Sequence, residues 1–302
     1  MTPFQGILPA IVTPLREDGT LNASSFERLL ERIYEAGAHG VYVCGQTGEG
    51  LQLPLEVRER AVEAAVANTP AGRAVIAHVG AASTAAAVRL ARHATRSGAQ
   101  AVSSLPPAGA YSYAEVHAYY QALAAASGVP VFVYFFPEFS GAIQTAGQIL
   151  DLCSIPNVRG LKFTSFDLYT LSLIRREGHT VLNGRDEVLA AGLFMGAHGG
   201  IGSFYNLVPD LFVSLYSHAQ SGRWAEARAV QDRINSLIRA VLAFPLLAAI
   251  KRLLSWSGVD CGLPVPPRRP LSPDEEAALR AAVTGAGFGP GQFLSQGGKR
   301  AG

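Results

Sequence analysis

The feature of this sequence that most constrains its fold is an alternation of short apolar runs with longer amphipathic segments, repeated eight times. The runs are rich in Val and Ile, and nearly continuous apolarity is typical of parallel strands covered on both faces. This repetition favours a closed parallel (β/α)8 TIM barrel over an open doubly wound sheet. The expected strands are residues 7–12, 41–44, 74–79, 101–105, 129–135, 158–163, 181–183 and 200–203.

The segments between the runs show helical periodicity. In the first, apolar residues recur at i, i+3, i+4, i+7 and i+8, with Asn22 before them as the expected N-cap and Gly37 after them as the expected end. Similar stripes predict helices over 55–67, 84–97, 113–126, 142–152, 167–176, 186–195 and 209–220.

After the eighth unit the strands cease. Three further helical stripes predict an all-helical appendix, packed on the side of the barrel or used in a subunit interface. We therefore expect a barrel over residues 1–222, a C-terminal helical appendix of the same unit over 223–286, and a flexible glycine-rich tail over 287–302.

Composition excludes several classes of function. The net charge is only +2 and forms no basic block, so neither nucleic acid nor a membrane surface is an expected partner. No apolar run is long enough to span a bilayer and no signal peptide is apparent. Three widely spaced cysteines fit a reducing, cytoplasmic compartment. None of the seven histidines has metal-ligand spacing, so no metal is expected.

Lys162 is conspicuous because only three of the 25 basic residues are lysines. It lies at the carboxyl end of an expected buried strand, where barrel enzymes carry their active sites. Burial disfavours the charged ammonium and therefore lowers the pKa of a lysine, which frees the amine to attack a carbonyl. The alternative is a lysine paired structurally with a carboxylate.

Two further elements belong at the same end of the barrel. Tyr134 ends the preceding strand, so its phenol is expected near Lys162, where it is able to relay a proton. Taken alone, a buried tyrosine is more often a core residue. The turn at 45–50, Gly-Gln-Thr-Gly-Glu-Gly, offers backbone N–H groups and the Thr47 hydroxyl to an anion such as a carboxylate.

Together these motifs resemble those of the dihydrodipicolinate synthase / N-acetylneuraminate lyase family of class I pyruvate-dependent aldolases, over residues 4–270. The resemblance rests on Leu-Pro-Ala-Ile-Val-Thr-Pro at 8–14, Gly-x-Thr-Gly-Glu at 45–49, Tyr-x-x-Pro at 134–137 and Gly-Leu-Lys at 160–162. It implies that Lys162 forms a Schiff base with pyruvate, that Tyr134 relays the proton, and that Gln46 and Thr47 hold the pyruvate carboxylate. It also implies a homotetramer that needs no cofactor.

Within the family the sequence is more similar to the lyase branch. Segments 162–169, 183–187 and 199–206 carry this similarity, and it implies that the hydroxylated chain of a 2-oxo sugar acid such as N-acetylneuraminate binds to Thr164, Gly184, Asp186, Glu187 and Ser203. The synthase branch, which condenses pyruvate with aspartate semialdehyde, usually has an arginine shortly after Tyr-x-x-Pro, but residues 138–141 contain no basic residue.

Several alternatives stay open at this point. Gln46 stands where a small hydroxyl residue is usual, and Phe135, Phe163 and Phe166 add apolar surface near the mouth, so the aldehyde partner is not fixed. Besides the lyase and the synthase, another 2-keto-3-deoxy acid aldolase or dehydratase fits the same motifs. A barrel that only binds 2-oxo acids, without catalysis, is the non-enzymatic alternative.

Overall fold

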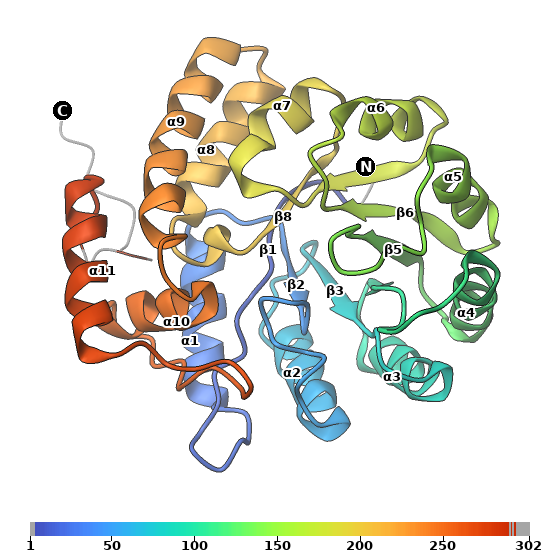
Figure 1. Ribbon diagram of the computed structural model, residues 1–302, viewed down its shortest axis with the longest axis horizontal. Helices are drawn as coiled ribbons and strands as arrows, with labels where there is room; N and C mark the ends of the chain where they lie inside the picture. The colour runs from blue at the N-terminus through green and yellow to red at the C-terminus, as the bar shows by residue number, and fades with distance from the viewer. Residues whose placement is uncertain (1–3, 290, 292, 294–302) are drawn as a thin grey trace.

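The computed structural model describes residues 4–289, 291 and 293. Within them, parallel strands form one sheet in the order β1-β8-β7-β6-β5-β4-β3-β2, and its two edges meet where the Ile11 N–H donates to the Tyr42 carbonyl at 3.0 Å. The predicted TIM barrel is confirmed (Figure 1). Its strands are β1 (Gly6–Pro9), β2 (Gly40–Val43), β3 (Ala74–His78), β4 (Ala101–Ser104), β5 (Val131–Phe135), β6 (Val158–Phe163), β7 (Thr180–Asn183) and β8 (Gly199–Gly202).

A helix follows each strand and covers the outside of the barrel (Figure 1). The Asn22 side chain accepts a hydrogen bond from the Ser25 N–H, and Gly37, with φ of 92°, follows the end of the first helix, as predicted. The helices are α1 (Ala23–Glu35), α2 (Leu55–Ala67), α3 (Thr84–Ser97), α4 (Tyr113–Ala126), α5 (Ala146–Ser154), α6 (Leu168–Arg176), α7 (Leu189–Phe194) and α8 (Pro209–Gln220), with 3-10 turns η1 (Asp186–Val188) and η2 (Phe204–Asn206).

Two predicted helix boundaries are wrong, for identifiable reasons. Helix α5 starts at Ala146 instead of 142, because Thr145 and Gln148 form a capping box that fixes the N-terminus there. The helix expected over 186–195 is divided into η1 and α7. The carbonyls of Asp186 and Glu187 accept hydrogen bonds from Gln231 and Asn235 of the appendix, and these side chains take the place of helical N–H donors.

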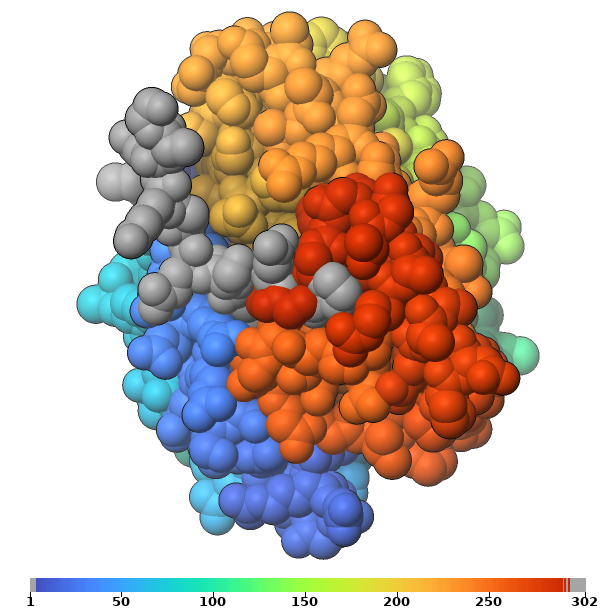
Figure 2. Space-filling view, turned by 90° about the vertical axis from the view of Figure 1, so that its left-hand side faces the viewer, coloured from blue at the N-terminus to red at the C-terminus, as the bar shows by residue number. Residues whose placement is uncertain are grey.

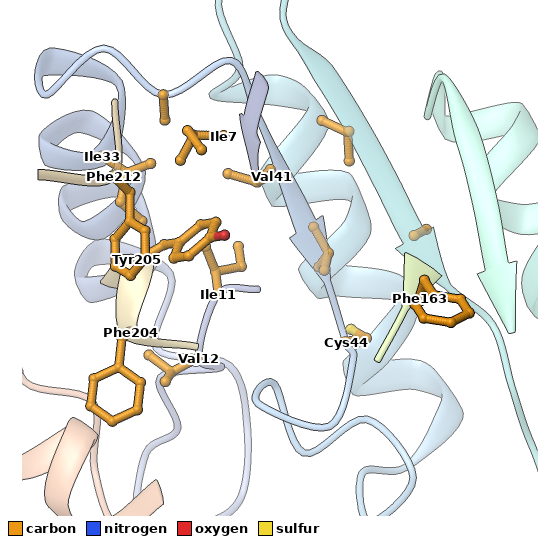
Figure 3. Packing of buried hydrophobic residues seen from close by; sticks show 14 of the residues in the cluster. Ile7, Ile11, Val12, Ile33, Val41, Cys44, Phe163, Phe204, Tyr205 and Phe212 are labelled. Carbon is orange, nitrogen blue, oxygen red and sulfur yellow. The ribbon is translucent and has the colours of Figure 1, made fainter. Parts of the chain in front are cut away.

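The apolar core has two parts. The larger one fills the layer between strands and helices, where Ile7 and Val41 on the strands lie near Ile33 of α1 (Figure 3). In the same layer the rings of Tyr205 and Phe212 have centroids 3.9 Å apart. A smaller cluster lies inside the barrel and includes Tyr134. The interior of the barrel is therefore packed with side chains.

The appendix comprises α9 (Trp224–Val241), α10 (Leu246–Trp256) and α11 (Pro273–Gly285). Helix α9 packs on α8, α11 packs on α9, and α10 lies beside η2. Figure 2 shows these elements, in orange and red, against the blue N-terminal part of the chain. Of the predicted tail, Phe288 and Phe293 are buried and stack on each other, while 290, 292 and 294–302 lie outside the described residues. None of the helices within the described ranges is long and apolar enough to cross a membrane.

Candidate active site

A cavity of about 720 Å³ opens at the carboxyl ends of the strands. The sequence predicted nine site residues, and the fold brings all of them to the wall of this one cavity, although they come from five different strand ends. They are Gln46, Thr47, Tyr134, Lys162, Thr164, Gly184, Asp186, Glu187 and Ser203. Their convergence is the main structural result for the site.

Lys162 projects from the end of β6 and is 4% exposed. Its Nζ atom lies 4.0 Å from the centroid of the Tyr134 ring and 4.4 Å from that of Tyr42, so two aromatic faces surround the amine. Burial lowers the pKa of Lys162 from 10.5 to about 7, and the nearby Asp186 carboxylate only partly opposes this shift. Burial therefore favours the neutral amine, which is the form that attacks a carbonyl.

Tyr134 faces Lys162 because their strands pair in register, Tyr134 with Lys162. Burial raises the pKa of the Tyr134 phenol, while Thr164 and Arg185 act to lower it, so the phenol keeps its proton at neutral pH. The ring makes an edge contact with His78, at 6.0 Å between centroids. Tyr134 thus lies beside the amine and carries a proton that it is able to transfer.

Histidines contribute structure at this end of the barrel. His78 donates from Nδ1 to the Cys44 carbonyl at 3.0 Å and accepts at Nε2 from the Leu105 N–H at 3.1 Å, and burial holds its pKa well below the usual value. His198 lies at the other end of the barrel: it precedes β8 at the amino end, where its ring accepts from the Val181 N–H.

The turn after β2 is fixed from three sides. The Thr13 hydroxyl donates to the Gly48 carbonyl at 2.7 Å, and the Thr47 hydroxyl lies 2.6 Å from that of Ser203. At Gly50 a Cβ atom would lie 1.8 Å from the Cys44 carbonyl oxygen, so only glycine fits. These contacts leave Gln46 and Thr47 facing the cavity.

An ion pair ties this turn to the appendix. Glu49, with φ of 55°, places its carboxylate 2.6 Å from Lys251 Nζ on α10, and both side chains are fully buried. Glu49 also accepts from the Val265 N–H at 2.7 Å, and Lys251 donates to the Leu263 carbonyl at 2.9 Å. Sequence reasoning did not predict this contact, since the two residues lie on separate elements far apart in the chain.

The polar side chains that follow β6, β7 and β8 are also closely packed. One Asp186 carboxylate oxygen accepts from the Phe204 N–H at 2.8 Å, and burial raises the pKa of Asp186 to about 7. A Cβ on Gly184 would lie 2.0 Å from the Thr164 hydroxyl oxygen, and one on Gly202 would lie 1.9 Å from Asp186. The glycines therefore let the polar side chains approach the backbone of β7 and β8.

Some lining residues were not predicted. Phe136 and Arg185 line the cavity next to predicted residues of their motifs, but the sequence assigned neither of them a role in binding or catalysis. Ile201, Gly202 and Phe204 also line the cavity, beside the predicted Ser203. The remaining unpredicted residues belong to the appendix, which closes part of the mouth in addition to covering the side of the barrel. These residues are Leu242, Pro245, Leu246, Leu247, Ala248, Pro267, Arg268 and Arg269. Their spacing gives no signal in the sequence, since contact with the cavity depends on how α10 docks.

In the part of the chain that the structure describes, no set of side chains provides the ligands for a metal ion. No group of three or more His, Cys, Asp or Glu side chains there is arranged to hold a metal ion. The reactive groups that line the cavity are an amine, a phenol and carboxylates.

A near-neutral lysine at the end of a barrel strand, with a phenol against it and a polar cavity around it, defines a Schiff-base lyase of the class I aldolase type. The sequence model of the dihydrodipicolinate synthetase family matches residues 3–286. The chain belongs to this family.

Individual relatives agree with that assignment. The chain is 38% identical to an N-acetylneuraminate lyase of Rhizobium meliloti over 93% of this chain and 94% of the relative. Among solved structures, it is similar to Proteus mirabilis N-acetylneuraminate lyase (TM-score 0.87, 30% identity, covering 94% of this chain and 99% of the other). It is also similar to the sialic acid aldolase of Ruminococcus gnavus (TM-score 0.89, 26% identity, 94% and 97%).

Proposed function

We propose that this protein reversibly cleaves a 2-oxo sugar acid such as N-acetylneuraminate to pyruvate and an aldehyde, through an imine on Lys162. The relatives named N-acetylneuraminate lyase support this choice of substrate. The observation that carries the proposal is the place of Lys162 Nζ: in the cavity wall, 4.0 Å from the Tyr134 ring, with a pKa of about 7.

The reaction begins at the amine. Neutral Lys162 attacks C2 of the 2-oxo acid, and uptake of one proton with loss of one water gives an iminium. The Tyr134 phenol accepts the proton of the C4 hydroxyl as it passes its own proton to the substrate carboxylate. The C3–C4 bond breaks, and its electron pair moves to the iminium nitrogen to form an enamine. The aldehyde leaves, C3 takes up the relayed proton to restore the iminium, and one water hydrolyses the iminium to release pyruvate, one proton and the free amine.

The remaining residues bind the two halves of the substrate. Gln46 and Thr47 hold the carboxylate next to C2, since both line the cavity and a glycine-rich turn offers N–H and hydroxyl donors to an anion. The polyol chain meets hydrogen-bonding groups that follow β6, β7 and β8. These are Thr164, Gly184, Asp186, Glu187 and Ser203, of which the carboxylates form the stronger, charge-assisted bonds with hydroxyl groups.

Release of pyruvate from N-acetylneuraminate tests the proposal, with lactate dehydrogenase and NADH as the readout. Wild type should release pyruvate with and without a chelator, and Lys162→Arg should not, since a guanidinium stays protonated and forms no imine. If N-acetylneuraminate is inert, a panel of 2-keto-3-deoxy sugar acids locates the substrate within the same chemistry. Pyruvate release by Lys162→Arg at the wild-type rate would overturn the mechanism.

We also propose a cytoplasmic homotetramer, in which barrel and appendix act as one unit. The three cysteines are unpaired and buried, which fits a reducing compartment. Phe194 is 67% exposed and contacts the partly exposed Trp224, so α7 and α9 present apolar surface suited to a subunit contact. Sedimentation equilibrium at micromolar concentration distinguishes a tetramer from a dimer or monomer.

A further inference from the structure

Arg185 is the one side chain in the turn 183–187 that lines the cavity without a role in the chemistry above. It follows Gly184 directly after β7, and its side chain is 18% exposed. A cation in the wall of a substrate cavity calls for an explanation, because desolvating a guanidinium is unfavourable unless an anion or an aromatic face compensates.

Aromatic rings fix the position of this guanidinium. The Arg185 Cζ atom lies 4.5 Å from the centroid of the Phe166 ring and 5.5 Å from that of Phe136. Phe136 in turn stacks on Tyr134, with centroids 6.0 Å apart and planes 12° from parallel. Arg185 is therefore one ring beyond the catalytic phenol, and its charge helps to lower the pKa of Tyr134.

Glu138 is the only carboxylate paired with Arg185 among the described residues, and it is a weak competitor for a ligand. Its side chain is 55% exposed and lies outside the cavity lining. An ion pair with one partner this exposed is screened by water and contributes little to stability. The buried Arg185 Nε has no hydrogen-bond partner in the described part of the chain, so the pair leaves donor capacity unused.

The other two arginines that line the cavity form hydrogen bonds with side chains other than Glu138. Arg269 makes two 2.7 Å hydrogen bonds to Glu275, which satisfies its charge. Arg268 donates to the Gln52 side chain at 3.0 Å, on the side of the mouth formed by the appendix. Arg185 is the arginine that packs on the aromatic stack leading to Tyr134.

The position of Arg185 also decides which part of a substrate it meets. The carboxylate next to C2 belongs at the turn after β2, and β8 and β1 stand between β7 and β2 in the barrel. One substrate carboxylate is not shared between these two sites. An anion at Arg185 must therefore come from the aldehyde half, on the far side of the C3–C4 bond.

We propose that Arg185 is a specificity-determining residue that binds a carboxylate at the far end of the aldehyde half, so that the preferred substrates are 2-oxo acids with a second, terminal acid group. This proposal rests on the imine chemistry proposed above and narrows the substrate class to 2-oxo sugar acids with a terminal acid group, so that N-acetylneuraminate, which lacks one, is expected to be a poorer substrate. A planar guanidinium is suited to such a group because it donates two parallel hydrogen bonds to one carboxylate.

The test runs the reaction in the direction of synthesis, with two aldehydes of equal chain length. D-mannuronate ends in a carboxylate, and D-mannose ends in a hydroxymethyl group. With pyruvate in excess, wild type should show kcat/KM for mannuronate about 10-fold to 100-fold above that for mannose, the range expected for a charge-assisted hydrogen bond. Arg185→Gln should abolish this preference mainly through KM for mannuronate.

Two variants serve as controls. Arg269→Gln removes a cation from the same cavity wall and should keep the preference, since its guanidinium is already occupied by Glu275. Glu138→Gln should keep or increase the preference, because it removes the competing carboxylate. If Arg185→Gln and Glu138→Gln both slow the two aldehydes equally, the pair is only structural and the proposal is wrong.

If wild type converts neither aldehyde, the affinity of the enzyme for each aldehyde is measured instead. Enzyme reduced with borohydride in the presence of pyruvate is titrated calorimetrically with each aldehyde. Tighter binding of mannuronate that is lost in Arg185→Gln supports the proposal, and equal affinity overturns it. Pyruvate that fails to attach to Lys162 at all would contradict the function itself, which is a separate outcome.

Discussion

Replacing Lys251 by methionine should destabilise the protein more than any change on its surface. Methionine has similar length and fills the same space, but it leaves the Glu49 carboxylate buried without its partner at 2.6 Å. Exposure of the two side chains is 1% and 0%, so water does not compensate either group. Breaking a buried ion pair by removing one partner costs about 3–5 kcal/mol.

The double variant Lys251→Met with Glu49→Gln should recover part of this loss. It removes both charges, and the amide oxygen introduced at position 49 can still accept from the Val265 N–H, as the carboxylate of Glu49 does. The double variant still lacks the hydrogen-bond donor to the Leu263 carbonyl. Leaving this buried acceptor unpaired costs about 1–3 kcal/mol. We therefore expect the two substitutions to be less than additive, by roughly 2 kcal/mol.

Urea unfolding provides the measurement. Both tryptophans lie in the appendix, on α9 and α10, so their fluorescence reports on this part, while circular dichroism reports on the whole chain. The matched control is Arg252→Met, one position along α10, whose partner Glu276 is 28% exposed and which should cost at most about 1 kcal/mol. A Lys251→Met variant no less stable than Arg252→Met would refute the reasoning.

Three further predictions concern the site. Tyr134→Phe should lower kcat about 10²-fold to 10⁴-fold while pyruvate still attaches to Lys162; loss of attachment would contradict a relay role. The rate of imine formation should rise with pH through about 7 and then level off, because only neutral Lys162 reacts; a midpoint near 10 would exclude a depressed pKa. Gly202→Ala should displace Asp186, from which its Cβ would lie 1.9 Å, and raise KM for the sugar acid without preventing pyruvate attachment.

Much of this architecture was predictable from the sequence because parallel strands and their helices have clear periodicities. The helices 55–67, 84–97, 113–126 and 209–220 coincide with α2, α3, α4 and α8. The convergence of residues on separate strands was predictable too, since a barrel brings all carboxyl ends to one face. Lys162 and Tyr134 are adjacent for this reason.

Other features depend on tertiary contacts that no local pattern encodes. The division of the segment after β7 follows from Gln231 and Asn235, which reach it from α9. The Glu49–Lys251 pair and the closure of the mouth by Pro245 and its neighbours depend on the docking of the appendix. Sequence periodicity predicted that these helices exist but not where they pack.

Borohydride reduction in the presence of isotopically labelled pyruvate, followed by peptide mass spectrometry, is the most direct test of the central claim. A free amine in the cavity beside Tyr134 predicts a single stable adduct on the peptide that contains Lys162, with loss of activity in proportion to labelling. No adduct, or an adduct on Lys251 with Lys162 unmodified, would contradict the account.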